Sequence, residues 1–88
     1  MTAPSGLPTV TLIGRLGCHL CEEARIEVLA AGVLQPFTLT EIDVDSDSEL
    51  RAEYGEQVPV VLVDDEMFSY FDVDRHALAR RIAAGSTG

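Results

Sequence analysis

The chain has 88 residues, of which 15 are acidic and 6 basic, and its formal net charge is −9. All the basic side chains except two histidines are arginine, so lysine Schiff-base chemistry is excluded. So acidic a composition also argues against nucleic acid or an anionic membrane as partner, because both need concentrated positive charge. The length predicts one domain, and 47% hydrophobic residues indicate a globular protein.

The beginning of the chain shows no targeting pattern. Residues 1–7 form a flexible lead-in rich in Pro, Ser and Gly, without basic residues or an apolar stretch, so no signal peptide is expected. No apolar run approaches the roughly 18 residues of a membrane span. The expected compartment is the cytoplasm, where a Cys-x-x-Cys pair is more often catalytic or metal-binding than a structural disulfide.

Strand and helix patterns alternate in the first half of the chain. Residues 8–14 begin with proline and are rich in β-branched side chains, which is typical of a strand. Apolar residues at spacings of three and four then predict a helix from Cys18 or His19 to about Ala31, with Gly32 as its stop. Only this helix separates the first strand from the next, which indicates a parallel βαβ unit.

The middle of the chain predicts a strand, a short helix and another strand. The second strand covers residues 36–43. The short helix begins at a capping box formed by Ser46 and Glu49, and it ends at Gly55. An apolar strand over residues 59–63 follows, with proline at its start.

The last part of the chain predicts a hairpin and a helix. An acidic turn leads into a partner strand over residues 67–71, and Asp72 or Asp74 caps the final helix. The predicted order is β-α-β-α-β-β-α in one domain over residues 8–84, with a tail over 85–88. Four aromatic side chains are assigned to the core and the hairpin faces, a substrate platform being the alternative: Tyr54, Phe68, Tyr70 and Phe71.

The only two cysteines, Cys18 and Cys21, lie where the first strand passes into the first helix. Only the thiolate is nucleophilic, and the free N–H groups of a helix N-terminus favour negative charge. We therefore expect the pKa of Cys18 to lie below the free value of about 8.5. Two alternatives stay open: a buried pair without redox role, and a partial metal site in which His19 is a third ligand.

Two motifs within this order of elements carry a family resemblance. The chain resembles the glutaredoxin-like branch of the thioredoxin fold, in small bacterial form, from about residue 9 to residue 82. The motifs are Cys18-His19-Leu20-Cys21 and Val58-Pro59-Val60. The resemblance implies an α/β fold with a four-stranded mixed sheet flanked by three helices. It also implies a thiol–disulfide oxidoreductase in which Cys18 attacks a protein or small-molecule disulfide and Cys21 resolves the mixed disulfide.

The resemblance further assigns residues around the cysteines. The Val58–Pro59 bond should be cis, packed against the cysteines and turning the Val58 backbone toward an extended substrate. Arg15 matches a basic residue that meets the carboxylate of glutathione or lowers the pKa of Cys18; the alternative is a solvated loop arginine. Leu20 and Gln57 are expected at the substrate site.

The sequence departs from glutaredoxins at two places. Their usual Cys-Pro-Tyr-Cys lacks the histidine found here, and His19 is expected either to stabilise the Cys18 thiolate or to face solvent. Their usual Gly-Gly pair is missing from residues 70–74. Asp72 and Asp74 are expected to contact a thiol substrate or to cap the last helix.

The expected partners follow from this assignment. Glutathione or another low-molecular-weight thiol is the expected co-substrate, and no bound cofactor or metal is expected. A disulfide-containing protein or small thiol is the expected substrate of a monomer that binds neither nucleic acid nor membrane. A metal-carrying or redox-inert binding module remains the alternative function.

Overall fold

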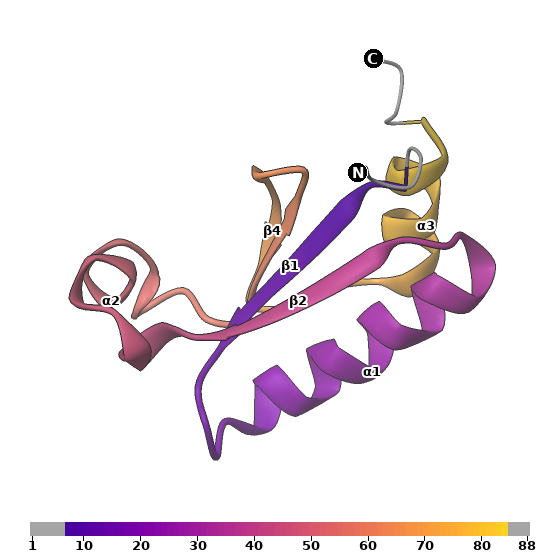
Figure 1. Cartoon of the computed structure of the whole chain (residues 1–88). Coiled ribbons are helices and arrows are strands. Elements are labelled where there is room, and N and C mark those ends of the chain that lie inside the picture. The colour runs from indigo at the N-terminus through magenta and orange to yellow at the C-terminus, as the bar shows by residue number, and fades with distance from the viewer. Residues whose placement is uncertain (1–6, 85–88) are drawn as a thin grey trace.

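The computed structural model describes residues 7–84, so most of the predicted lead-in and the whole tail lie outside the described residues. The element order is the predicted one, with an added 3-10 turn, η1 (Figure 1). The elements are β1 (Thr9–Gly14), α1 (His19–Leu34), β2 (Thr38–Asp43), η1 (Val44–Ser46), α2 (Ser48–Tyr54), β3 (Val60–Val63), β4 (Glu66–Tyr70) and α3 (Arg75–Ala84).

The strands form the predicted four-stranded mixed sheet, in the order β2-β1-β3-β4. β1 and β2 are parallel, as expected for two strands joined by the helix α1, whereas β3 is antiparallel to both β1 and β4. Ile13, near the end of β1, pairs with Val60, at the start of β3. This register places Pro59 at the same end of the sheet as the loop that carries the cysteines, where β1 ends and β3 begins.

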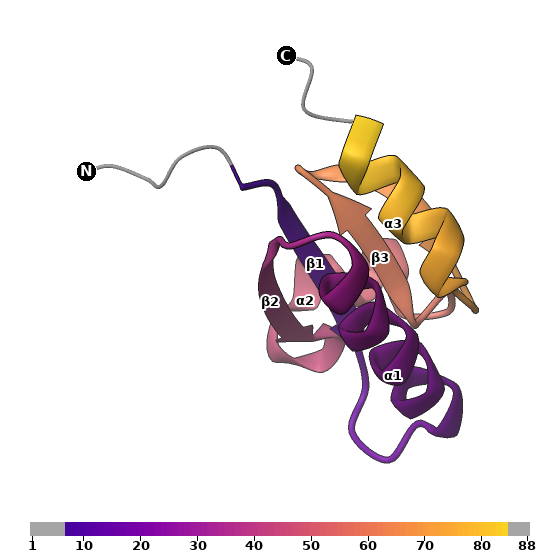
Figure 2. The same cartoon turned by 90° about the vertical axis from the view of Figure 1, so that its right-hand side faces the viewer.

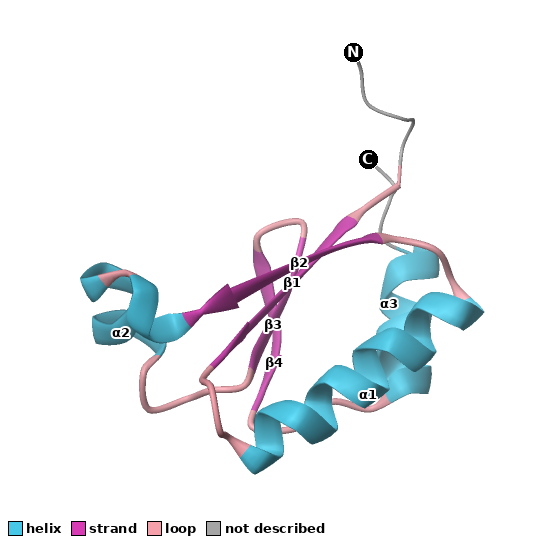
Figure 3. Cartoon of the chain, turned by 60° about the horizontal axis from the view of Figure 1, so that its bottom comes forward, coloured by secondary structure: helices cyan, strands magenta, loops and turns pink. Residues whose placement is uncertain are grey.

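The two faces of the sheet carry separate cores. α1 and α3 lie side by side on one face and pack on Val10 and Leu12 of β1 (Figure 2). α2 packs against the other face, where Ile13 and Val60 are buried, and lies toward one end of the sheet (Figure 3). Side chains alternate between the two faces along β1, so this strand contributes residues to both cores.

The predicted stop of α1 at Gly32 is wrong, because the helix continues to Leu34. Its last turn closes when the Gln35 N–H donates to the Ala31 carbonyl at 2.8 Å. Gly32 faces the Phe37 ring, which would lie 3.4 Å from a Cβ added at this position. Pro36 comes after the helix end, where it no longer interrupts helical hydrogen bonds.

The predicted capping box of α2 is also wrong by one residue. Asp47 is the N-cap, and its carboxylate accepts the Glu49 N–H at 2.7 Å. The Ser46 hydroxyl instead donates to the Asp43 carbonyl at 2.7 Å within η1. The predicted end at Gly55 is confirmed.

The aromatic assignment holds for three of the four residues. Phe68 packs against the α1/α3 core, and Tyr54 packs against the α2 core. Tyr70 lies on the hairpin strand β4, as predicted, and is 50% exposed because β4 is an edge strand. Phe71 is 48% exposed and lies beyond β4, so its assignment to the core or a hairpin face is wrong.

Candidate functional site

The two cysteines lie at the N-terminus of α1. Cys18 is the N-cap residue, and its Sγ accepts the Cys21 N–H at 3.1 Å. Its own N–H donates to the Arg15 carbonyl at 3.2 Å, and its carbonyl accepts the Glu22 N–H at 3.1 Å. The sulfur of Cys18 thus replaces a missing backbone acceptor at the positive end of the helix dipole.

Cys21 lies deeper than Cys18. It is 8% exposed, whereas Cys18 is half-buried, and both thiols are free. Burial, together with the adjacent Cys18 sulfur, raises the pKa of Cys21 to about 11, although a hydrogen bond from the Arg15 backbone acts in the opposite direction. A Cβ at Gly14 would lie 3.3 Å from the Cys21 Sγ, so glycine gives this sulfur room against the end of β1.

The loop before β3 lies at the end of the sheet where β1 passes into the cysteine loop. The Val58–Pro59 bond is cis, as the resemblance implies, and Pro59 is fully buried. Its carbonyl accepts the Phe71 N–H at 2.8 Å. Gln57 is half-buried, and its N–H donates to the Tyr54 carbonyl at 2.8 Å.

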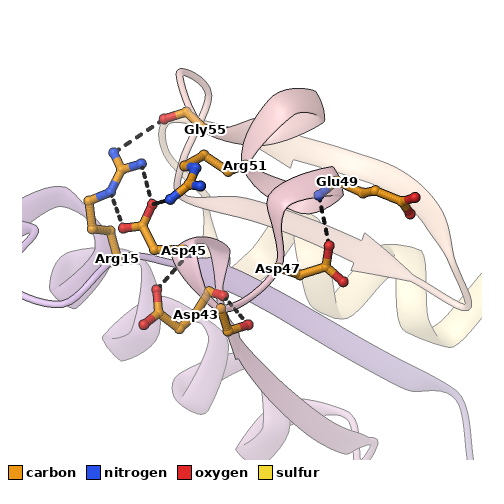
Figure 4. A network of polar contacts seen from close by, with 8 residues as sticks. Arg15, Asp43, Asp45, Asp47, Glu49, Arg51 and Gly55 are labelled. Atoms are coloured by element: carbon orange, nitrogen blue, oxygen red, sulfur yellow. Dashed lines mark hydrogen bonds and ion pairs between the residues drawn. The ribbon is translucent and has the colours of Figure 1, made fainter.

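The Arg15 side chain is hydrogen-bonded to Asp45 and Gly55 of the same chain (Figure 4). Its Nε and Nη2 donate to the two carboxylate oxygens of Asp45 at 2.8 and 3.2 Å, and Nη1 donates to the Gly55 carbonyl at 3.2 Å. Arg51 adds a longer contact of 3.8 Å to the same carboxylate. The hydrogen bond from Arg15 holds the pKa of Asp45 below its usual value. Arg15 therefore ties the cysteine loop to η1 and to the end of α2.

His19 makes its contact along the outside of α1. Its Nε2 lies 2.8 Å from Oε2 of Glu23, four residues further on, and the two side chains are 82% and 59% exposed. The imidazole faces solvent, as one of the two sequence interpretations expects. Its partner is the Glu23 carboxylate.

The remaining predicted residues gather on one flank of α1. Leu20, Asp72 and Asp74 line a groove of about 510 Å³ between α1 and the loop that joins β4 to α3. Asp74 caps α3 by accepting the Ala77 N–H at 2.8 Å, which decides between the two predicted caps. Arg15 and Cys21 instead line a smaller hollow of about 260 Å³ toward β2.

Sequence reasoning missed two residues of this region and the backbone conformation of a third. Phe71 has a φ of +72°, which the sequence signals only through the missing glycine of residues 70–74. Asp45 lies thirty residues from Arg15, and no local pattern connects the two. Gly14 had a signal, since a glycine at the end of a strand often marks a close approach.

Two further searches cover residues 7–84 only. In this range no three His, Cys, Asp or Glu side chains come together so that they could hold a metal ion. None of the helices described is both long and apolar enough to cross a membrane.

The sheet order and the cysteine pair at the start of α1 define a thioredoxin-fold protein with a Cys-x-x-Cys site. Residues 9–83 match the glutaredoxin-like domain family (DUF836), and the chain belongs to this family. It is 36% identical to the uncharacterized protein Rv0508 of Mycobacterium tuberculosis, over 92% of this chain and 89% of that protein.

Solved structures agree with this assignment. Protein Ne2328 from Nitrosomonas europaea is similar with a TM-score of 0.76 and 25% identity, over 93% of this chain and 99% of that chain. Protein XcR50 from X. campestris gives 0.72 and 26%, over 86% and 97% of the two chains. A mutant thioredoxin from Halobacterium salinarum shares the fold with a TM-score of 0.69 at 21% identity, over 92% of this chain and 76% of that one.

Proposed function

We propose that the protein is a thiol–disulfide oxidoreductase that reduces or exchanges protein or low-molecular-weight disulfides through Cys18 and Cys21. One observation supports this most: the Cys18 sulfur accepts a backbone N–H at the start of α1, while Cys21 lies buried behind it with a raised pKa. The arrangement separates an attacking sulfur from one that stays protonated until it is needed.

The proposed reaction has two displacement steps. The Cys18 thiolate attacks one sulfur of the substrate disulfide, the substrate S–S bond breaks, and one substrate thiolate leaves. Cys21 then loses its proton and attacks the Cys18 sulfur, which releases the second substrate thiolate. The Cys18–Cys21 disulfide is the product, and two electrons have passed from the protein to the substrate.

The surrounding residues are given supporting roles in this proposal. The backbone of Val58, next to the buried Pro59, pairs with an extended substrate, and Leu20, Gln57, Asp72 and Asp74 form its surroundings. Arg15 stabilises the thiolate electrostatically, whereas His19 faces solvent beside Glu23 and is given no role in the reaction. The hydrogen bond to Asp45 is the main cause that raises the pKa of Arg15, and the nearby Cys18 adds a smaller contribution in the same direction.

The reductant and the setting are part of the same proposal. Glutathione or another low-molecular-weight thiol returns the Cys18–Cys21 disulfide to the dithiol, without a bound cofactor. The protein acts as a monomer in the cytoplasm, where thiols are kept reduced, and it needs neither nucleic acid nor membrane.

The decisive experiment measures the reduction potential of the cysteine pair. We expect a Cys18–Cys21 disulfide, seen as a mass loss of two hydrogens, with a potential between about −120 and −270 mV. Cys21→Ser should trap mixed disulfides on Cys18, and Cys18→Ser, its matched control, should trap none. Absence of the disulfide in every redox buffer would overturn the proposal. Stoichiometric zinc or copper in the purified protein would favour a metal-carrying module instead.

A further inference from the structure

The groove between α1 and the β4–α3 loop reaches the first turn of α1. Leu20, which lies between the two cysteines in sequence, lines its near end. Phe71 lines it from the other side, and the Phe71 N–H donates to the carbonyl of Pro59 at 2.8 Å. A ligand in this groove therefore lies along the first turns of α1, the helix whose start carries Cys18 and Cys21. Its volume of about 510 Å³ falls in the range of binding pockets, about 300–1,000 Å³.

The groove presents apolar side chains to solvent. Leu20, Ile26 and Phe71 are 50%, 61% and 48% exposed. Val73, also in the lining, is half-buried against the α1/α3 core. Apolar side chains that gather in one hollow, and are not scattered over the surface, are typical of an interaction site.

Phe71 is held in an unfavourable backbone conformation. Its φ of +72° lies in the left-handed region, where a bulky side chain is a rare outlier. The hydrogen bond to Pro59 holds the backbone, and the Tyr70 ring packs edge-on with its centroid 5.0 Å away. Residues held in such conformations gather at binding sites, so the strain is a second observation that points to this groove.

The charge of the groove is negative. Four carboxylates line it, from Glu23, Glu27, Asp72 and Asp74, and no basic side chain does. Arg75 neutralises Glu27 at 2.9 Å, and His19 contacts Glu23 at 2.8 Å. Asp74 is used as the helix cap. The Asp72 side chain is exposed in the groove, where its charge can meet a cation.

Resting on the proposed function, we propose that this groove binds the polypeptide of a protein substrate beside its disulfide. It selects a segment in which an apolar side chain stands next to an arginine or lysine. The apolar side chain packs on Leu20 and Phe71, and the cation meets Asp72. The electron transfer is the exchange already described, with the protein's own dithiol as reductant.

The test compares disulfides in a single turnover of the fully reduced protein. The probes are the disulfide dimers of short peptides containing Cys-Leu-Arg, Cys-Leu-Glu or Cys-Gly-Gly, and the uncharged bis(2-hydroxyethyl) disulfide. At low salt we expect the Arg peptide to react about tenfold faster than the Glu peptide, because an attractive field raises the association rate. Salt should shrink this ratio by screening.

Two variants and a control locate the effect. Asp72→Arg should abolish or reverse the preference for the Arg peptide, and Phe71→Gly should reduce the advantage of the Leu peptides over the Gly-Gly peptide. Glu53→Arg changes the charge equally at an exposed site on α2 and should keep the preference. The rate with the small uncharged disulfide should stay within about twofold of wild type in Glu53→Arg. In Asp72→Arg and Phe71→Gly the readout is the ratio of peptide rates measured within the same variant.

The outcomes separate the two proposals. Equal rates with all peptides, beside normal reduction of the uncharged disulfide, would overturn the groove and leave the proposed function standing. Loss of the preference in Glu53→Arg as large as in Asp72→Arg would also overturn it, because the effect would then belong to the net charge. No reaction with any disulfide would overturn the proposed function itself.

Discussion

Position 71 places an aromatic side chain on a backbone that glycine adopts without steric cost. The φ of +72° at Phe71 carries a strain of about 1–3 kcal/mol for a residue with a Cβ. Phe71→Gly and Phe71→Ala both remove the ring, but only the glycine variant relieves this strain. We expect the glycine variant to be more stable than the alanine variant by roughly 1 kcal/mol, measured by urea unfolding.

The pair of variants is its own control, because the lost ring contacts are the same. Equal stability, or a more stable alanine variant, would show that residue 71 does not keep the left-handed conformation in solution.

At the scale of residues, the sequence predicts the chemistry of a side chain better than it predicts which residues that side chain contacts. The spacing of Cys18 and Cys21 at the junction of a predicted strand and helix indicates thiol chemistry, because that chemistry needs only a local motif at a helix start. The partner of Arg15 is not predictable in this way, because Asp45 is thirty residues away and the pair forms only in the folded chain. Leu20, Asp72 and Asp74 were named one by one, whereas their common groove follows from the packing of α1 beside the β4–α3 loop.

At the scale of elements, α1 contains a glycine in a regular helical turn. Gly32 lies inside α1, and an added Cβ would meet the Phe37 ring at 3.4 Å, which is an ordinary contact. We expect Gly32→Ala to raise the free energy of unfolding by about 0.5–1 kcal/mol, because alanine favours the helix. Urea unfolding checks this. Lower stability would mean that the helix ends at Gly32, as the sequence pattern had indicated.

An ion pair between Glu27 of α1 and Arg75 of α3 makes the stability of the protein depend on pH. Three donors of Arg75, the backbone N–H and two guanidinium nitrogens, bond to Glu27 at 2.9–3.0 Å. These bonds lower the pKa of Glu27 from 4.5 to about 2. The unfolded chain therefore binds a proton more readily, so the contribution is complete above pH 4.5 and is lost as the pH falls toward 2.

Glu27→Gln should remove this part of the pH dependence. Between pH 4.5 and pH 2 the variant should lose less stability than the wild type, measured by urea unfolding at each pH. Glu56→Gln, at an exposed residue outside the α1/α3 contact, is the matched control and should follow the wild type. Parallel curves for Glu27→Gln and wild type would contradict the role of the Arg75 contact.

Elements were predictable in type and order but not at their ends. Hydrophobic spacing and β-branched runs depend on local sequence, and they predict every α-helix and β-strand of residues 7–84 but not the 3-10 turn η1. Ends depend on competition between neighbours: Asp47 caps α2 because Ser46 is already used in η1. The exposure of Tyr70 and Phe71 depends on β4 being an edge strand, which local pattern does not reveal.

At the scale of the whole molecule, the acidic side chains outnumber the basic ones by nine. Repulsion among them opposes the compact state, and salt screens it, with a Debye length of about 10 Å at 0.1 M. The exposed ion pairs are weakened by the same salt, but each contributes only about 0–1 kcal/mol. We expect stability in urea to rise between low and physiological ionic strength. A fall would show that the ion pairs outweigh the repulsion.

The Arg15–Asp45 pair has a consequence for any carboxylate that approaches the cysteine loop. Asp45 acts as a tethered ligand of Arg15, and tethering gives it a high effective concentration against a free competitor. A diffusing thiol with a carboxylate must displace it before it can use Arg15. Asp45→Ala should therefore lower KM more for a carboxylate-bearing disulfide than for an uncharged one, and equal changes would contradict this competition. In the intact protein, occupancy of Arg15 by its own chain favours substrates that bring no carboxylate to this loop.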